Sequence, residues 1–268
     1  MFDLPALEAS LADARCAGKL HFAPVTNSTN TDALEAARAG APHWSVYFAD
    51  EQLAGRGRSN HTWQSPAGEG LYVSILFCPC TFPNHLPMLP LIAGLAAASA
   101  IKEVSGLTID LRWPNDLLIG PRKTGGILVE ARTEADKIAY AVIGIGINVH
   151  QRSFDPTLAT PATSLDLDSG HIISRQDLLI SLLNSLELET RDLPHAFHTI
   201  PSRIEAASTW VRGKRVHVHG PQPCTGVTAG LDPNGFLLVQ TENGLVTVRT
   251  GGLRAVEPTA EPEPADIS

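Results

Sequence analysis

Several features are scarce in this sequence, and each scarcity argues against a class of protein. The 4 cysteines, which are Cys16, Cys78, Cys80 and Cys224, show no C-x-x-C spacing, so neither a disulfide framework nor a metal site is expected. Basic residues number 20 against 28 acidic ones, and the resulting net charge of −8 argues against broad nonspecific binding of nucleic acid. A local cationic site for a phosphate remains compatible with this balance.

A long apolar run and a leader peptide are also missing. The longest apolar run, LIAGLAAASAI, has about half the length that a membrane span needs. The opening segment MFDLPALEASLADARC carries acidic residues where a signal peptide has basic ones. We therefore expect a cytoplasmic protein that does not enter a membrane.

The residues that are present predict a globular α+β protein. A hydrophobic content of 43% over 268 residues is enough for one substantial core and a small second one. Strand-like and helix-like patterns follow each other, and the strand-like runs after residue 107 are joined by short turns, which favours antiparallel neighbours. We expect strands at 44–50, 71–77 and within 107–149, a capped helix after Ser28 or Thr29, and helices at 86–105 and 174–209.

The residue pattern changes from helix-like to strand-like near residue 208. Five short strand-like runs follow, separated by the turn segments DPNG and ENG, which predicts a small β-barrel. The final EPTAEPEPADIS is rich in proline and glutamate, as in disordered segments. The expected organisation is a catalytic-size domain at 1–208, a barrel at 209–257 and a disordered tail at 258–268.

The stretch QLAGRGRSNHTWQSPAGEG at 52–70 joins two expected strands. Gly55, Gly57 and Asn60 stand where a dinucleotide fingerprint needs three glycines, but the third glycine is missing and a strand follows, so the Rossmann interpretation fails. RKTGG likewise lacks the preceding glycine of a phosphate-binding P-loop. A flexible backbone with two cations, Arg56 and Arg58, remains, and an ordinary surface hairpin is the alternative.

Three blocks in order make the sequence resemble a known family. GRGRSNHTWQSPAGEGLYVSILF, RWPNDLLIGPRKTGGILVE and VIGIGINV, with an STN before the first long helix and a TSL at 163–165, are similar to the signature blocks of biotin protein ligases. The resemblance runs from about residue 26 to the C-terminal strands. It implies a class II synthetase-like domain with a mixed, largely antiparallel sheet, followed by an SH3-like β-barrel.

The resemblance also implies an activity and its partners. Such ligases use Mg-ATP to convert biotin into biotinyl-5′-AMP with release of pyrophosphate, and then transfer biotin to a lysine of a biotin carboxyl carrier domain. Only about 25 residues precede the STN block, too few for a three-helix DNA-binding domain, so we expect a monofunctional ligase that does not bind DNA. Whether the protein forms a homodimer is left open.

Site residues follow from the matching positions. The resemblance implies a catalytic set of Lys123, Arg58 and Asp116, and an ATP or adenylate set of Arg58, Asn115, Lys123 and Asn148. The implied biotin-binding residues are Ser28, Thr29, Gln52, Gly55, Arg56, Arg58, Trp63, Lys123, Gly126, Leu128 and Gly144. Glycines Gly144 and Gly146 would let their strand approach the ligand, or mark a bulge.

Alternatives remain for single residues. Asp116 either orients the acceptor amine or accepts its proton, but it is also suited to capping a turn after Pro114. Lys123 stands in a GPRK turn, where a surface lysine is common. Asn60 and His61 replace a glycine and an arginine of the family pattern, and Arg112 stands where a lysine is common. A slower adenylation or a weaker hold on the intermediate is the expected result at His61.

Two other functions compete with biotin ligation. A lipoate or octanoate ligase would share the fold and the adenylation chemistry, but it needs a longer apolar channel in place of polar contacts to a ureido group. A nonenzymatic binding module would use the basic cluster Arg212, Lys214 and Arg215 of the barrel. That second alternative leaves the three ordered blocks without a role.

Overall fold

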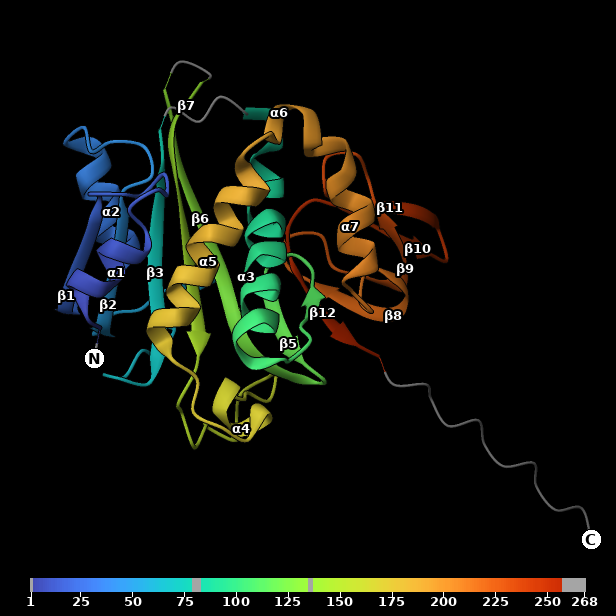
Figure 1. Cartoon of the computed structure of the whole chain (residues 1–268). Coiled ribbons are helices and arrows are strands. Elements are labelled where there is room, and N and C mark those ends of the chain that lie inside the picture. Colours follow the sequence, from blue (N-terminus) through green and yellow to red (C-terminus); the bar gives the residue numbers. More distant parts are fainter. Residues whose placement is uncertain (1, 79–82, 135–136, 257–268) are drawn as a thin grey trace, which may run out of the picture.

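The computed structural model describes residues 2–78, 83–134 and 137–256, and is built around a seven-stranded mixed sheet (Figure 1). Its strand order is β1-β2-β3-β7-β6-β5-β4. β1 and β2 are parallel, and every other neighbouring pair is antiparallel, as the short turns predicted. The strands are β1 (Leu20–Thr26), β2 (Val46–Gln52), β3 (Gly70–Phe77), β4 (Asp110–Arg112), β5 (Asp116–Ile119), β6 (Arg122–Glu134) and β7 (Lys137–Asn148).

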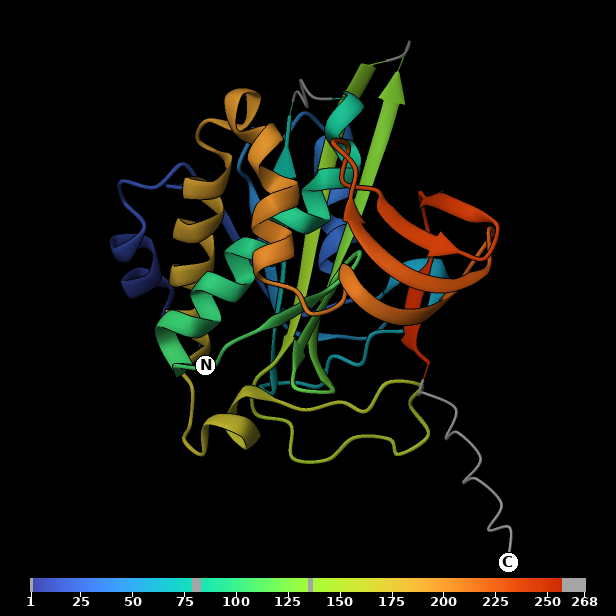
Figure 2. The same cartoon turned by 90° about the vertical axis from the view of Figure 1, so that its right-hand side faces the viewer.

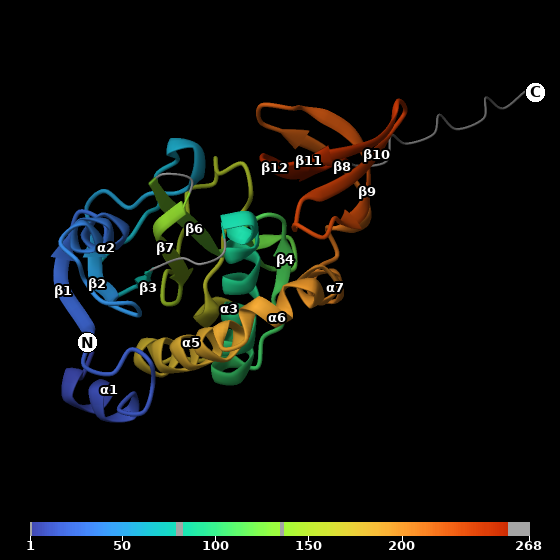
Figure 3. The ribbon, with the colours of Figure 1, turned by 90° about the horizontal axis from the view of Figure 1, so that it is seen from above.

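Helices cover both faces of this sheet. α3 and α5 pack together on one face, and α2 lies on the other (Figure 3). The alternation of side chains in β3 fits this arrangement, because Ile75 points to the large core under α3 and Leu76 to the small cluster under α2. The helices are α1 (Leu4–Ser10), α2 (Thr29–Arg38), α3 (Leu89–Ser105), α4 (Leu165–Ser169), α5 (Arg175–Thr190), α6 (Leu193–Ala196) and α7 (Ile200–Ala206), with short 3₁₀ turns η1 (Arg58–Asn60), η2 (Pro83–Met88) and η3 (Phe197–Thr199).

The apolar helix α3 begins and ends where local sequence rules place it. Pro90 occupies its first turn, where the missing N–H costs nothing, and Gly106 ends it in the left-handed conformation with φ 73°. The continuous helical stretch Leu86–Ser105 is long and apolar enough by composition to cross a membrane. Here 61% of its 18-residue apolar window is buried inside the protein, and α3 packs against α5 and the sheet.

Strands β8–β12 form a second, five-stranded antiparallel sheet with the order β11-β10-β9-β8-β12. They are β8 (Arg212–His219), β9 (Cys224–Leu231), β10 (Leu237–Thr241), β11 (Gly244–Val248) and β12 (Gly252–Ala255). The five expected strands are therefore present, while their closure into an SH3-like barrel stays a prediction. The expected disordered tail 258–268 lies outside the described residues.

The second sheet is packed against the first domain. The buried Trp113 donates from Nε1 to the carbonyl of Gly235, 3.0 Å away, and Glu205 of α7 accepts from Arg212 of β8 and from the backbone of Leu231. Apolar residues of both parts belong to one continuous buried cluster. The division near residue 208 stays a prediction about domains, but the contact brings the last strands close to the central sheet.

Candidate functional site

One pocket of about 830 Å³ lies where the loop 53–65, the start of α2, strands β5–β7 and the second sheet meet. It contains all but one of the residues that the sequence assigned to the site. Those that line it are Ser28, Thr29, Gln52, Arg56, Arg58, Trp63, Asn115, Asp116, Lys123, Gly126, Leu128, Gly144 and Asn148.

The exception is Gly55, which does not line the pocket. A Cβ atom at this position would lie 2.4 Å from the backbone oxygen of Trp63 and 2.7 Å from Oγ of Ser65. Gly55 is therefore needed where the loop folds back on itself. It has a packing role, because the outgoing and returning strands of the loop touch at this point, and its contact with biotin stays a prediction.

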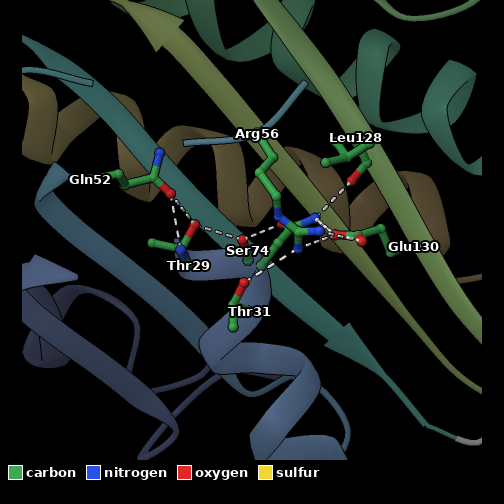
Figure 4. Close-up of polar contacts among 8 residues, drawn as sticks. Thr29, Thr31, Gln52, Arg56, Ser74, Leu128 and Glu130 are labelled. Atoms are coloured by element: carbon green, nitrogen blue, oxygen red, sulfur yellow. Dashed lines mark hydrogen bonds and ion pairs between the residues drawn. The ribbon is translucent and has the colours of Figure 1, made fainter. Parts of the chain in front are cut away.

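The polar groups at the start of α2 are already paired with one another. Ser28 occupies the N-cap with extended backbone, but its side chain makes no capping bond, contrary to the sequence prediction. Instead, Oε1 of Gln52 accepts from the Thr29 backbone at 2.9 Å and from the Thr29 hydroxyl at 3.2 Å (Figure 4). Gln52 Nε2 in turn donates to Ser65, 2.8 Å away. A ligand at this helix start meets preoriented amide and hydroxyl groups.

Three residues that the sequence reasoning missed continue this network. Asn30 donates to Oε2 of Glu130 at 2.8 Å and accepts from the hydroxyl of Ser74 at 2.6 Å. Glu130 also accepts hydrogen bonds from Arg56. Nη1 of Arg56 donates to Oε1 at 3.0 Å, and Nη2 donates to Oε2 at 2.8 Å (Figure 4). A signal for two of them was present, because Asn30 closes the STN block and Glu130 ends the GGILVE block.

The glycines of β7 make room for side chains. A Cβ at Gly144 would lie 2.0 Å from Oδ1 of Asn30, and a Cβ at Gly146 would lie 2.6 Å from Nε1 of Trp63. Both glycines were expected to admit the ligand to the strand. In this structure the space that a Cβ atom would fill is occupied by Asn30 at Gly144 and by Trp63 at Gly146.

Arg58 joins the loop to the second sheet. Its guanidinium donates to Oδ1 of Asn115 at 3.2 Å, to the carbonyl of Gly251 at 2.9 Å and to the hydroxyl of Thr250 at 3.3 Å. Burial lowers the pKa of Arg58, while the nearby Asp116 raises it. The left-handed residue of this turn is Ser59, with φ 54°.

Lys123 and Trp63 contact each other in the lining of the pocket. Nζ of Lys123 lies 5.5 Å from the centre of the Trp63 ring, a cation–π distance. Nε1 of Trp63 is buried without a hydrogen-bond partner, so one donor of the pocket remains unused. Backbone bonds fix the position of Lys123, because its N–H donates to Pro161 and its carbonyl accepts from Thr163.

Asp116 lies between two cations. Its Oδ1 is 2.5 Å from Nζ of Lys123, and its Oδ2 accepts from Nε and Nη2 of Arg112 at 3.0 and 2.6 Å. Burial raises the pKa of Asp116, but Lys123 and Arg112 together outweigh burial and leave the pKa below its ordinary value. Asp116 is therefore ionised at neutral pH and is not a turn cap.

The two asparagines assigned to the nucleotide are held by backbone oxygens. Asn115 donates to Ile127 at 2.8 Å, and Asn148 donates to Thr163 at 3.0 Å. The segment that follows β7 also lines the pocket, and it extends toward the last strand of the second sheet (Figure 2). Sequence reasoning did not single out its lining residues, which are Gln151, Ser153, Phe154, Leu158, Ala159, Thr160 and Ala162.

Further titratable groups face the pocket from the loop and the second sheet. His61 lies on the loop, and its Nδ1 is 2.8 Å from the carbonyl of Arg58. His219 and Arg254 line the pocket from β8 and β12. Burial lowers the pKa of His219, with Arg254 adding to the effect. Within the described residues, no three His, Cys, Asp or Glu side chains gather into a group that could hold a metal.

Family models match two parts of the chain. Residues 22–148 match a model described as "Biotin/lipoate A/B protein ligase family", and residues 212–251 match "Biotin protein ligase C terminal domain". The matched ranges contain the start of α2, the loop, Lys123, both glycines of β7 and the turn that Arg58 contacts.

Curated relatives and solved structures agree with these matches. The chain is 35% identical over 233 residues to the "Bifunctional ligase/repressor BirA" of Bacillus subtilis, covering 84% of this chain and 70% of the relative. It is 31% identical to the "Biotin--[acetyl-CoA-carboxylase] ligase" of Mycobacterium tuberculosis, covering 84% and 85%. A biotin protein ligase from Aquifex aeolicus in complex with biotin and ATP is similar in structure, with a TM-score of 0.78, 30% identity, and 89% and 100% of the two chains covered.

Proposed function

The chain belongs to the biotin/lipoate A/B protein ligase family, and we propose that it is an ATP-dependent biotin protein ligase. The observation that carries this proposal is the cation pair at one end of the pocket, Lys123 and Arg58, opposite a polar helix start at the other. The known relatives named as biotin ligases favour biotin over lipoate as the acid that enters.

The polar end of the pocket suits the ureido ring of biotin. Thr29 and Gln52 present a hydroxyl and an amide whose positions are fixed by bonds to Ser74 and Ser65. A ureido group needs both donors and acceptors, and these side chains supply both. Gly126, Leu128 and Trp63 offer apolar surface between this end and Lys123. A lipoyl or octanoyl chain offers no donors or acceptors at this end, so these groups would gain nothing beyond the hydrogen bonds that they already make with one another.

The first step joins two anions. The biotin carboxylate attacks the α-phosphate of Mg-ATP, an oxygen–phosphorus bond forms, and pyrophosphate leaves with the electron pair of the broken bond. Two negative charges at about 4 Å repel by about 4 kcal/mol at an effective dielectric of 20. Lys123 projects from a paired strand into this region, so its ammonium is placed to stabilise the charge as the new bond forms. Magnesium enters as part of the nucleotide substrate.

Arg58 and the two asparagines are assigned to the nucleotide. The guanidinium of Arg58 is directed toward Asn115 and the second sheet, where it can close the loop over a bound adenylate. Arg56 is paired with Glu130 in this structure, and a carboxylate or phosphate of the ligand is the natural competitor for its guanidinium. Asn148 lies next to the lining segment after β7, where the nucleoside is expected.

The second step transfers biotin to a protein lysine. The acceptor nitrogen attacks the acyl carbon of the adenylate, the carbon–nitrogen bond forms, and AMP leaves with the electrons of the carbon–oxygen bond. A lysine ammonium has a reference pKa of about 10.4, so it must lose a proton before attack. The acceptor that we propose is a biotin carboxyl carrier domain, and the place of action is the cytoplasm.

Pyrophosphate exchange tests the proposed function without any carrier protein. The purified enzyme is mixed with Mg-ATP, labelled pyrophosphate and one acid at a time, either biotin, lipoate, octanoate or none. Biotin alone is expected to stimulate the incorporation of label into ATP. Stimulation by lipoate or octanoate instead would transfer the assignment to the related ligases, and the absence of exchange with all three acids would contradict adenylation altogether.

A further inference from the structure

β4, the strand before the hairpin of β5 and β6, carries an arginine that contacts Asp116. Arg112 is almost fully buried, at 8% exposure, and approaches Asp116 from the side opposite Lys123. Two of its nitrogens bind the same oxygen, Oδ2, while Nη2 also donates to the hydroxyl of Thr160 at 3.0 Å. These contacts leave Oδ1 as the oxygen of Asp116 that faces Lys123.

The guanidinium of Arg112 is itself held in place by the linker to the second sheet. Its central carbon lies 5.2 Å from the ring centre of Trp210, and Nζ of Lys214 lies 5.3 Å from the same ring. A planar guanidinium can stack on an aromatic ring and bind a carboxylate through two nitrogens at once, which an ammonium cannot do. Arginine at this position therefore fixes the orientation of Asp116 as well as its charge.

The two steps of the reaction make different demands on Lys123. In the first step its ammonium is drawn to the new bond between carboxylate and phosphate, and it then no longer neutralises Asp116. A buried carboxylate without a cation would take up a proton. Arg112 does not contact the reacting groups and stays paired, so it preserves the negative charge of Asp116 after Lys123 turns away.

We infer that Arg112 is a positioning residue for the transfer step, which keeps Asp116 ionised and aims Oδ1 at the incoming acceptor amine. This inference rests on the proposed function. The acceptor ammonium binds Oδ1, loses one proton to water, and attacks the acyl carbon as a neutral amine. The carbon–nitrogen bond forms while the bond to the phosphate oxygen breaks, AMP takes that electron pair, and the nitrogen loses its second proton to water.

Asp116 acts in this scheme by orienting the amine and not as the base. Lys123 and Arg112 face its carboxylate directly, and Arg58 lies near enough to interact with it. A carboxylate that keeps Arg112 after Lys123 turns away, with Arg58 nearby, still holds a proton poorly, so it stays an ionised hydrogen-bond acceptor and is a weak base. Of the two roles that the sequence left open for Asp116, the structure favours orientation.

The test separates the two half-reactions of the full-length enzyme. Biotinyl-5′-AMP is formed on the enzyme, excess biotin carboxyl carrier domain is added, and the single-turnover rate of transfer is measured from about pH 8 to about pH 6. The informative quantity is the ratio of variant to wild-type rate at each pH. Ionisation of the acceptor lysine is common to both enzymes and cancels in this ratio.

Arg112→Gln is expected to slow transfer by about 100-fold at neutral pH, with a much smaller loss of biotin-dependent pyrophosphate exchange. Its rate ratio is expected to fall further as the pH is lowered, because Asp116 without Arg112 takes up a proton at a higher pH. Arg112→Lys keeps the positive charge but loses the contact through two nitrogens. The ratio of its transfer rate to the wild-type rate should therefore lie below one and should not change with pH. Arg203→Gln, which removes the bidentate pair with Glu189 far from the pocket, is the matched control.

His219 is the group that could imitate this pH effect, since Arg112 is among the cations that lower its pKa. The ratios are therefore repeated in a His219→Gln background, with His61 and Arg254 unchanged. A double variant gives an independent reading, because Asp116→Asn removes the charge that Arg112 is inferred to preserve. In the Asp116→Asn background, adding Arg112→Gln should not lower the transfer rate further. If the glutamine variant does not fold, Arg112→Lys takes its place.

Each result separates this role from a structural one. Equal losses in exchange and transfer with a flat rate ratio would show that Arg112 only supports the fold, and would overturn the inference. Full additivity of the Arg112 and Asp116 variants would do the same. A wild-type enzyme without biotin-dependent exchange would instead refute the proposed function, on which the inference depends.

Discussion

The pocket has one wall made by a hairpin and another made by a loop, and the two are held in different ways. The hairpin of β5 and β6 is hydrogen-bonded along its length, and β6 pairs with β7 from Gly125 to Glu134. The loop 53–65 has only a few internal backbone bonds, and the side chains of Arg56 and Arg58 connect it to the rest of the pocket. Both walls carry cations that line the pocket.

The difference suggests a division of labour. A cation that stabilises a transition state is most effective when it is carried by a rigid element, and the paired backbone of Lys123 on the hairpin agrees with the role proposed for this residue. Substrates must also enter and products must leave, which needs a segment of low local stability. The loop fits that need, because the interactions that Arg56 and Arg58 make with the protein can be exchanged for interactions with the ligand.

The largest effect is expected on the hairpin. Lys123→Ala removes the preset cation and should reduce biotin-dependent pyrophosphate exchange by about 10³-fold, while the thermal unfolding curve stays close to that of the wild type. Arg122→Ala is the matched control, since Arg122 is the adjacent cation and pairs with Asp168 outside the pocket. Unchanged exchange in Lys123→Ala would remove this residue from the mechanism.

A smaller effect of a different kind is expected on the loop. Arg58→Gly should leave adenylation measurable but speed the release of biotinyl-5′-AMP by about 10²-fold, because hydrogen bonds to a charged group contribute about 1.5–3 kcal/mol each. Free adenylate then labels lysines of a bystander protein such as albumin, which is detected with streptavidin. Arg58→Lys should release less adenylate than Arg58→Gly. If Arg58→Gly loses exchange and labelling together, Arg58 is needed for chemistry and not for retention.

The smallest effect concerns the ligand-free loop. Glu130→Gln removes the partner of Arg56, whose side chain is 43% exposed, and a pair of this kind is worth about 0.2–1 kcal/mol. Trypsin cleavage after Arg56 or Arg58 should therefore rise by about 2- to 5-fold without ligands, and biotin with ATP should suppress the increase. Glu189→Gln, which removes the partner of Arg203, serves as the control. Equal cleavage in all three proteins would mean that Glu130 does not restrain the loop.

Local sequence rules predicted the parts of the site that depend on neighbours in the chain. Gly106 ended α3 where expected, the short turns gave antiparallel strands, and the loop was correctly placed between two strands. The ordered blocks brought Lys123 and Arg58 to one pocket. Roles for these residues remain predictions, because geometry alone does not measure a rate.

Contacts between distant residues could not be read in the same way. The insertion of β7 between β3 and β6, and the approach of Asn30 to Gly144, depend on pairings far apart in sequence. The packing of Gly55 against Trp63 and Ser65 could not be read for this reason, since a glycine gives the same local signal whether a ligand or a neighbouring strand needs the space. The contact of Arg58 with Gly251 joins residues 193 positions apart, and no local pattern marks it.

That last contact has a consequence for how the protein is made. Residues 250–254 line the pocket together with a loop that leaves the ribosome much earlier. A nascent chain can complete the seven-stranded sheet and bury α3 while its pocket still lacks one side. The pocket is therefore closed on this side only after the second sheet has been made and has packed against the first.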